Sequence, residues 1–450
     1  MQNWKDKKVL IMGLGIQGGG VGVARFFAQI GSKVTVTDLK SDDDLRPSID
    51  ALSIYPNVNF HLGGHSEDDF LNTDLIVKGP SVRWDNIYIE DAIKHGIRVI
   101  METSYFALHT KAKVIGITGT RGKSTTTALI YETLNKYYKQ GKVYLAGNIP
   151  DTCAIELLNI TKPNDLVVLE LSSWQLAGFH RIKVSPEISI FTTIYEDHLN
   201  YYNHMQKYVY DKAAIFLYQK PKDHFITYTK TYDILQEYKI AIPAIIHKYS
   251  AQDFPAELQY IRGVHNKLNA ALALGACIQI LQDINPQDII NFISCSKGLR
   301  FRQEVIAQIN NVTVINDSTS TTPIATVTAL HTFHDKPIVL ILGGSSKKLS
   351  VTDLVSTIEN NVTNIRKIIL IKGEMTEEIK PLLLKIKALD VSVIIDNFQT
   401  AVQDAFRACS QLNEPVYLLF SPGAPSFAQF KNEFDRGEQF DIVVSDIMKK

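Results

Sequence analysis

The chain has 450 residues, 45% of them apolar and 21% charged, and its 47 lysines and arginines balance its 47 aspartates and glutamates. Such a composition is typical of a globular protein with room for about three domains. The balanced charge excludes a chain that is held to nucleic acid or to an anionic membrane by its overall field, so any anion binding must come from local sites.

Neither the cysteines nor the apolar runs indicate an exported or membrane protein. The four cysteines form no CxxC pair, which gives no sign of a zinc ribbon or a disulfide framework. No apolar run reaches the roughly 18 residues of a membrane span, and the first run leads into glycines rather than a cleavage site. We expect a soluble, cytoplasmic protein with reduced thiols, and we predict a monomer that binds neither nucleic acid nor membrane.

Short apolar runs alternate with segments of helical length along the whole chain. The runs are Val9–Met12, Lys33–Thr37, Leu75–Val77, Val99–Met101, Val114–Ile117, Leu166–Leu169, Ile188–Phe191, Val339–Leu342, Ile368–Ile371, Val391–Ile395 and Val416–Phe420. Such runs are typical of buried parallel strands, and their alternation with helices predicts doubly wound α/β sheets. We place the domain boundaries at about 1–108, 109–297 and 298–450.

The first glycine-rich loop follows a predicted strand and precedes a predicted helix. It reads Gly13-Leu-Gly15-Ile-Gln17-Gly18, and Asp38 ends the next strand 20 residues later. This is the dinucleotide fingerprint, in which glycines let the backbone approach a pyrophosphate at a helix N-terminus. Alone, the pattern leaves three interpretations open: a nicotinamide enzyme, a UDP-sugar site or a tight turn.

The second glycine-rich loop also lies between a predicted strand and a predicted helix. It reads Gly119-Thr120-Arg121-Gly122-Lys123-Ser124-Thr125. Its amides can cradle phosphates, Lys123 can neutralise charge on the β- and γ-phosphates, and Ser124 can bind Mg²⁺. The loop is shorter than a full GxxxxGK motif, because Ile117 stands where the first glycine would fall. Its setting favours a phosphate-binding loop over a chance match.

Further motifs follow the second loop in chain order. They are Gly147-Asn148, Glu170-Leu-Ser172-Ser-Trp-Gln175-Leu, Thr193-Ile-Tyr-Glu-Asp-His198, Tyr208-Val-Tyr-Asp-Lys212, Gly263-Val-His-Asn266-Lys-Leu-Asn269, Phe301-Arg302, Asn316-Asp317-Ser318 and Ser421-Pro-Gly-Ala-Pro-Ser426. Together with the short GTxGKST loop, they resemble the Mur ligase family over nearly the whole chain. The resemblance is strongest to the members that add glutamate, since the DNPR motif of the diaminopimelate- and lysine-adding members is absent.

The resemblance implies both the fold and the reaction. A Rossmann-like first domain would hold the UDP substrate, a central P-loop ATPase-type domain with a mostly parallel sheet would hold ATP, and a C-terminal Rossmann-like α/β domain would hold the amino acid. ATP would phosphorylate a carboxylate to an acyl phosphate, which an amine then attacks, in peptidoglycan precursor synthesis. The implied substrates are UDP-N-acetylmuramoyl-L-alanine and glutamate, expected as D-glutamate, and the implied cofactors are ATP and Mg²⁺.

The resemblance also implies roles for individual residues. The catalytic residues would be Lys123, Glu170, His198 and Lys212, and the metal ligands would be Ser124, Glu170, His198 and a carbamylated Lys212. Besides the second loop, ATP would contact Asn266, Asn269, Arg302 and Asp317. Substrates would contact Gly15, Gln17, Gly18, Asp38, Asn148, Ser172, Gln175, Thr321, Lys347 and Ser426, the last three being for the amino acid.

Several positions depart from the family pattern, and other functions stay open. Arg121 stands where asparagine is usual, and Thr319 stands where lysine is common. Another amino acid or L-glutamate is therefore a possible substrate of a Mur-type ligase. Two other classes also fit single motifs: an NAD-dependent oxidoreductase would use the first loop, and a P-loop ATPase or regulatory module would use the second without an acceptor.

Overall fold

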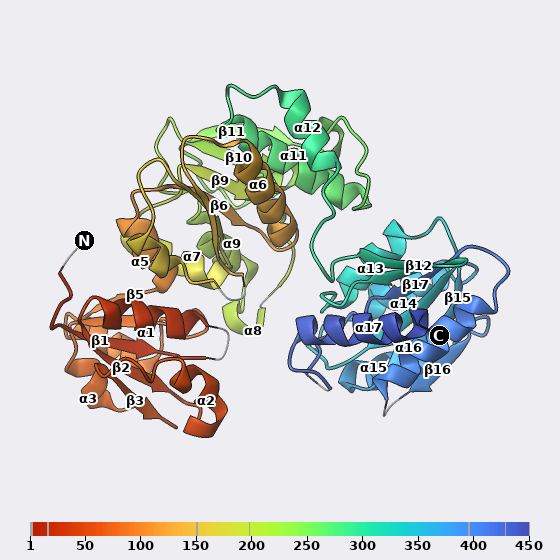
Figure 1. Cartoon of the computed structure of the whole chain (residues 1–450), viewed down its shortest axis with the longest axis horizontal. Coiled ribbons are helices and arrows are strands. Elements are labelled where there is room, and N and C mark those ends of the chain that lie inside the picture. The colour runs from red at the N-terminus through yellow and green to blue at the C-terminus, as the bar shows by residue number, and fades with distance from the viewer. Residues whose placement is uncertain are drawn as a thin grey trace. The chain divides into compact units, whose positions relative to one another are not determined.

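The computed structural model describes residues 3–15, 18–149, 152–197, 199–394, 397–427 and 429–449. These residues form three sheets whose strands are joined mostly by helices (Figure 1), which confirms the predicted α/β fold. Contacts divide the chain into two compact units, of which the first comprises Met1–Ala256 and His265–Ile293 and the second comprises Glu257–Val264 and Ser294–Lys450. The first unit holds two sheets and the second unit holds one; the three domain boundaries stay predictions.

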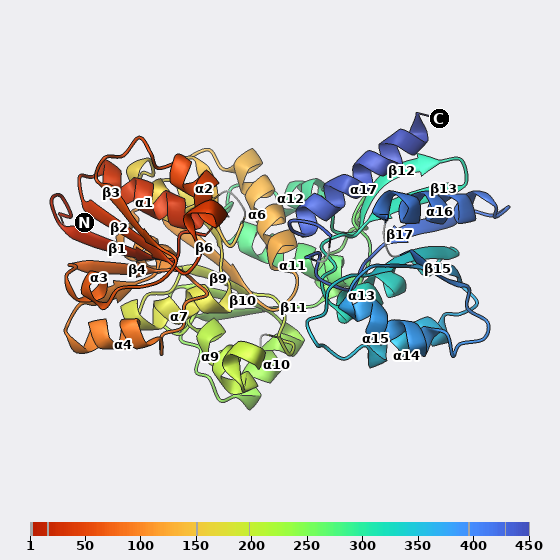
Figure 2. The same cartoon turned by 90° about the horizontal axis from the view of Figure 1, so that it is seen from below.

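The first sheet is wholly parallel and has the strand order β3-β2-β1-β4-β5. Its elements are β1 (Lys8–Met12), α1 (Gly19–Gln29), β2 (Lys33–Asp38), α2 (Asp42–Asp50), β3 (Val58–Leu62), α3 (Glu67–Leu71), β4 (Leu75–Lys78), α4 (Ile87–Lys94), β5 (Arg98–Ile100) and α5 (Glu102–His109). Figure 2 shows α1 and α2 on one face and α3 and α4 on the other. The strand order reverses between β1 and β4, so the first glycine-rich loop lies at the switch point where α/β sheets bind ligands.

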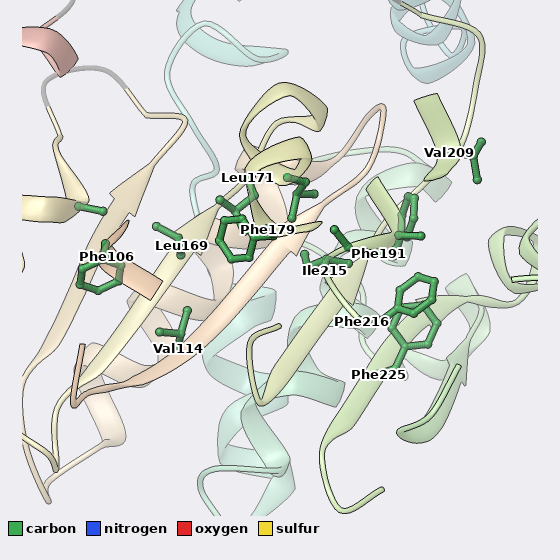
Figure 3. Packing of buried hydrophobic residues seen from close by; sticks show 14 of the residues in the cluster. Phe106, Val114, Leu169, Leu171, Phe179, Phe191, Val209, Ile215, Phe216 and Phe225 are labelled. Atoms are coloured by element: carbon green, nitrogen blue, oxygen red, sulfur yellow. The ribbon is translucent and has the colours of Figure 1, made fainter. Parts of the chain in front are cut away.

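The second sheet is also parallel, in the order β11-β10-β9-β6-β8-β7. Its elements are β6 (Lys113–Thr118), α6 (Lys123–Tyr137), β7 (Val143–Gly147), the 3-10 helix η1 (Ala154–Asn159), β8 (Leu166–Glu170), α7 (Ser173–Ile182), β9 (Ile188–Phe191), α8 (Leu199–Tyr202), α9 (Met205–Ala213), β10 (His224–Tyr228), α10 (Thr229–Glu237), β11 (Ile245–Tyr249), the 3-10 helix η2 (Ala251–Asp253), α11 (Val264–Ile278) and α12 (Pro286–Ser294). One face packs on a core that includes Leu169, Phe179 and Phe216 (Figure 3). The strand β6 lies between β8 and β9, so residues after all three strands meet at one edge.

The third sheet, in the second unit, has the order β12-β13-β17-β14-β15-β16. Its elements are β12 (Glu304–Ile309), β13 (Val312–Asn316), α13 (Pro323–Thr332), β14 (Ile338–Gly343), α14 (Thr352–Asn360), β15 (Ile365–Ile371), α15 (Glu374–Leu383), β16 (Val391–Ile394), α16 (Phe398–Ser410), β17 (Val416–Phe420) and α17 (Glu433–Met448). The edge strand β12 runs antiparallel to β13, and all other pairs are parallel. One face packs against α13, α14 and α15, and the other face packs against α16 and α17.

The first two sheets form one unit because the segment after β7 packs on helices of the first sheet. The Ile155 amide donates to the Glu102 carboxylate at 2.7 Å, and Arg25 pairs with Glu156 at 3.1 Å. Gly22 of α1 approaches this segment so closely that an added Cβ would lie 2.6 Å from the sulfur of Cys153. None of the described helices is both long enough and apolar enough to cross a membrane.

Candidate functional site

The second glycine-rich loop joins β6 to α6, and two of its glycines adopt backbone angles that other residues rarely reach. Gly119 has φ 142° and Gly122 has φ 86°. A Cβ added to Gly119 would overlap the Thr192 hydroxyl, and one added to Gly122 would overlap the Asn269 carboxamide. Both positions therefore require glycine for their conformation and for the close approach of their neighbours.

Residues that follow β9 hold the backbone of this loop. The Thr120 amide donates to the Thr193 carbonyl at 2.7 Å, and the Arg121 amide donates to the Thr193 hydroxyl at 2.9 Å. The Thr192 hydroxyl donates to the Arg121 carbonyl at 2.5 Å. These contacts use main-chain atoms of the loop, so they form whatever side chain stands at position 121.

Two lysines from different helices meet at one carbonyl of the loop. Lys123, at the start of α6, donates to the Gly119 carbonyl at 3.0 Å, and Lys212, on α9, donates to the same oxygen at 2.9 Å. Lys212 is fully buried against the Tyr208 ring. Burial lowers the pKa of the Lys212 amine well below its usual value, the Lys123 ammonium lowers it further, and Asp197 and Glu170 act in the opposite direction.

Glu170 ends β8 beside the loop with one carboxylate oxygen unsatisfied. Its Oε1 accepts a hydrogen bond from the Asn148 carboxamide at 3.1 Å, whereas its buried Oε2 has no hydrogen-bond partner. A buried carboxylate oxygen requires a donor or a cation, and Mg²⁺ prefers such oxygen ligands. His198, another predicted metal ligand of this region, lies outside the described residues. Among the described residues, no group of three or more His, Cys, Asp or Glu side chains is arranged to hold a metal ion.

The first turn of α6 also meets α11. Asn269 donates to Asn266 at 3.2 Å and accepts a hydrogen bond from Thr126 at 3.4 Å, and both asparagines are buried. Ser124 and Thr125 are half-buried in the same turn of α6. The structure thus gathers the predicted phosphate-binding loop, both lysines, Glu170, Asn148 and the two asparagines at one edge of the second sheet.

Ser172 and Gln175, predicted to contact substrate, form the N-terminal capping box of α7. The Gln175 amide donates to the Ser172 hydroxyl at 3.2 Å, and the Ser172 amide donates to the Gln175 carboxamide oxygen at 2.9 Å. The two side chains therefore have a structural role at the start of a helix beside the site.

At the first glycine-rich loop, Asp38 faces the loop itself. Its carboxylate accepts hydrogen bonds from the amides of Leu14 at 2.8 Å, Gly15 at 3.2 Å and Lys40 at 3.0 Å. Gly18 caps α1 in the left-handed conformation, whereas Gln17 lies outside the described residues. Asp38 thus stabilises the shape of the loop, a role that the dinucleotide fingerprint did not predict.

The other predicted contacts lie in the second unit: Arg302 precedes β12, and the rest follow β13, β14 and β17. Asp317 accepts hydrogen bonds from the Ser421 hydroxyl at 2.7 Å and the Gln303 amide at 3.1 Å, and burial raises the pKa of its carboxyl to about 7. Lys347 donates to the Thr321 hydroxyl at 3.4 Å. The Ser426 hydroxyl is buried without a hydrogen-bond partner, and Arg302 is exposed.

Sequence reasoning missed Arg436, which is the largest fully buried side chain in the described part of the chain. It lies on α17 on the same buried face as Phe440, Val443 and Val444. A charged residue at helical spacing from an apolar stripe is a signal that could have identified it, because such residues are seldom fully buried without a partner.

Comparisons with known proteins agree with this geometry. Residues 117–269 match the family model "Mur ligase middle domain", and residues 7–101 match "Mur ligase MurD-like, N-terminal domain". The chain is 34% identical over 470 residues to the UDP-N-acetylmuramoylalanine--D-glutamate ligase of Roseiflexus sp., covering 97% of this chain and 98% of the relative. It is 33% identical over 466 residues to the protein of the same name from Borreliella burgdorferi, covering 98% of both chains.

Two solved structures share the fold over the whole length. The UDP-N-acetylmuramate-alanine ligase MurC of Thermotoga maritima has a TM-score of 0.61 at 19% identity and covers 99% of this chain and 100% of its own. The MurF ligase of Thermotoga maritima in complex with ADP has a TM-score of 0.58 at 15% identity, with the same coverage.

Proposed function

The chain belongs to the Mur ligase family of ATP-dependent amide-bond-forming enzymes, and from this premise we propose that it adds D-glutamate to UDP-N-acetylmuramoyl-L-alanine in peptidoglycan precursor synthesis. Full-length similarity to relatives that carry this activity in their names supports the choice of substrates. One structural observation supports a phosphoryl-transfer site. Two lysine side chains from separate helices meet at the Gly119 carbonyl, beside the buried carboxylate of Glu170.

The reaction proceeds in two stages. The terminal phosphoryl group of ATP passes to the alanine carboxylate, so that the bond to ADP breaks and an acyl phosphate forms. The glutamate amine then attacks the carbonyl carbon and loses a proton, and phosphate leaves. Such chemistry needs mostly positioning and charge neutralisation, which the loop amides and Lys123 provide.

The residues at the loop fit Mg²⁺. The unsatisfied Oε2 of Glu170 is an oxygen ligand of the right kind, and Ser124, His198 and a modified Lys212 complete the proposed set. When bound, Mg²⁺ would reduce the repulsion between the substrate carboxylate and the triphosphate.

Lys212 is proposed to carry a carbamate. Burial lowers the pKa of Lys212, which favours its neutral amine; the amine nitrogen would bond to the carbon of CO₂ and release one proton, which leaves an anionic oxygen ligand. The position supports this change: Lys212 is buried within reach of the same carbonyl as Lys123, so an anion there would balance the neighbouring ammonium.

A phosphate-release assay with a panel of UDP-linked acceptors and amino acids tests the function. We expect release to require ATP, UDP-N-acetylmuramoyl-L-alanine and D-glutamate together. Release without an acceptor would indicate an ATPase, and faster release with L-glutamate or another amino acid would replace the proposed substrate. Titration with NAD⁺, followed by calorimetry, checks the oxidoreductase alternative and should show no binding.

Metal binding is tested separately from turnover. Crystals grown with a non-hydrolysable ATP analogue and Mn²⁺ should show anomalous peaks beside Glu170 and Lys212. Glu170→Gln should lose the first peak, whereas Glu187→Gln, on the exposed Glu187, should retain both. Peaks elsewhere in the wild type would contradict the proposed ligands.

A further inference from the structure

Arg436 has an unusual electrostatic setting for a buried arginine. The side chain is 0% exposed, and its guanidinium donates to the Ser318 hydroxyl at 3.1 Å, the Ser318 carbonyl at 2.6 Å and the Ala424 carbonyl at 2.9 Å. No carboxylate of the described residues lies within ion-pair distance of Arg436; Glu433 and Asp317 act on it only through space. Burial lowers the pKa of Arg436 to about 10, so it remains a cation at neutral pH.

Such a charge is costly to bury, because a buried cation is ordinarily paired with an anion. The acceptors here are two carbonyls and one hydroxyl, which satisfy hydrogen bonds but carry no negative charge. Glu433 and Asp317 act on this charge through space but form no ion pair with it, so a cation held by neutral acceptors lies at the end of the third sheet.

The hydrogen bonds of Arg436 reach two loops, a third loop lies beside its guanidinium, and each of the three carries one of the predicted amino-acid contacts. Ser318 lies in the loop after β13, which leads to Thr321. Ala424 lies in the loop after β17, which leads to Ser426.

The third loop follows β14 and leads to Lys347. Its Gly344 has φ 139°, and a Cβ added there would lie 2.6 Å from the Pro425 carbonyl and 3.5 Å from Nη1 of Arg436. The Ser345 amide also donates to the Pro425 carbonyl at 3.0 Å. The turns after β14 and β17 are thus packed against each other beside the guanidinium.

We propose that Arg436 is a positioning residue for the carboxylate of the incoming amino acid. It hydrogen-bonds the loops that lead to Thr321 and Ser426, lies beside the loop that leads to Lys347, and places a positive charge among them. The inference rests on the proposed function, and it extends that function to a residue that does not touch the substrate. The hydroxyl of Ser426, in the loop that Arg436 contacts through Ala424, is buried without a hydrogen-bond partner and is suited to donate to a carboxylate.

Steady-state kinetics on the full-length enzyme test the proposal with Arg436→Lys and Arg436→Met. We expect the KM for D-glutamate to rise about tenfold in the lysine variant and further in the methionine variant, because lysine keeps the charge and methionine removes it. The KM values for ATP and for the UDP substrate should change by less than about twofold. Arg407→Lys, which alters an exposed arginine of α16, is the matched control and should behave as the wild type.

The order of the two variants separates an electrostatic role from a structural one. In a purely structural site, methionine would be tolerated better than lysine, because it buries no charge. A methionine variant with the wild-type KM for D-glutamate, or an equal change in all three KM values, would overturn the proposal. If neither variant folds, Ser318→Ala decides, because it removes the acceptor of Nε: a raised KM for D-glutamate supports the proposal, and an unchanged one overturns it.

The amino acid that the wild type ligates is determined first, so that a failure of the proposed function can be told apart from a failure of this inference. A wild type that ligates a different amino acid refutes the proposed substrate. The KM values of the variants are then compared for the amino acid that the wild type does use, so the role of Arg436 is still tested.

Discussion

The two glycine-rich loops share one backbone plan and carry opposite side-chain chemistry. Each follows a parallel strand at a switch point of its sheet, and each ends at a left-handed glycine, Gly18 or Gly122, that caps the next helix. At the first loop, the carboxylate of Asp38 accepts hydrogen bonds from loop amides. At the second loop, the side-chain nitrogens of Lys123 and Lys212 donate to a loop carbonyl.

The difference shows that a glycine-rich loop provides shape, whereas the charges placed around it determine the ligand. Amides that face Asp38 are already satisfied by a fixed anion. A loop flanked by two lysines and followed by the unsatisfied oxygen of Glu170 suits a triphosphate with its metal ion. The comparison predicts that charge changes at the second loop affect chemistry, whereas those at the first loop affect only shape and substrate affinity.

The largest expected effect is that of Lys123→Ala. Loss of the ammonium at the phosphates should lower kcat by about a thousandfold, the size expected when a preorganised charge is removed from phosphoryl transfer. The melting temperature should remain near that of the wild type, because the hydrogen bonds of Lys123 to the Gly119 and Thr120 carbonyls lie within its own loop. Lys136→Ala, in the exposed part of the same helix, is the control. A near-normal rate would remove the assignment of the second loop to ATP.

A somewhat smaller effect is expected for Lys212→Ala. Turnover should fall by about a hundredfold through loss of the anionic ligand, and short-chain carboxylic acids such as acetate should restore part of it. The exposed Lys207 on the same helix provides the control variant Lys207→Ala. Its turnover should equal that of the wild type and should not change when acetate is added. An inactive Lys212→Ala enzyme that no carboxylic acid restores, together with wild-type density for an unmodified amine, would contradict the carbamate.

The sequence predicted the fold class and the second loop well, because both depend on local patterns. Continuous apolar runs identified most inner strands, whereas β3, β7, β11 and β12 were missed because edge strands have one exposed side and mix polar with apolar residues. The inner strands β10 and β13 were also missed; threonine interrupts the apolar residues of both.

The site was harder to predict, because side-chain direction is set by tertiary packing. The fingerprint located Asp38 correctly at a strand end but could not indicate that its carboxylate turns back to the amides of Leu14 and Gly15. Likewise, Arg436 is 118 residues from Ser318, and no local motif links them. Spacing predicts which residues reach an edge of a sheet, while the neighbours across that edge determine what each residue contacts.

Asp38→Asn tests the comparison at the first loop. An amide group can accept at only one of its two ends, so at least one of the three backbone donors loses its acceptor, at a cost of about 1–3 kcal/mol. We expect the KM for the UDP substrate to rise about tenfold and the melting temperature to fall by a few degrees, with the KM for ATP unchanged. Asp50→Asn, at an exposed position of α2, is the control. A raised KM for ATP would show that the loops are not separate in function.

The smallest effect is expected at Arg121, the unusual residue of the second loop. The hydrogen bonds that hold this residue in place use its backbone amide and carbonyl, so Arg121→Asn should leave the loop intact and change its charge. Thr319 carries no charge, and its hydroxyl donates to the Phe301 carbonyl at 2.8 Å. Our hypothesis is that Arg121, or the pair Lys347 and Lys348, supplies the positive charge that a lysine at position 319 would carry.

Under this hypothesis Arg121→Asn alone should lower kcat/KM about threefold, the size expected for a partly exposed charge. Adding Thr319→Lys should restore part of the loss, because it returns one positive charge. Steady-state rates at two ionic strengths check the origin of the effect, since salt should reduce the difference between variant and wild type. A fully active Arg121→Asn enzyme would exclude Arg121 as the substitute and leave the lysine pair. A loss that neither salt nor Thr319→Lys changes would mean that the arginine acts through shape, which would break the distinction between the two loops.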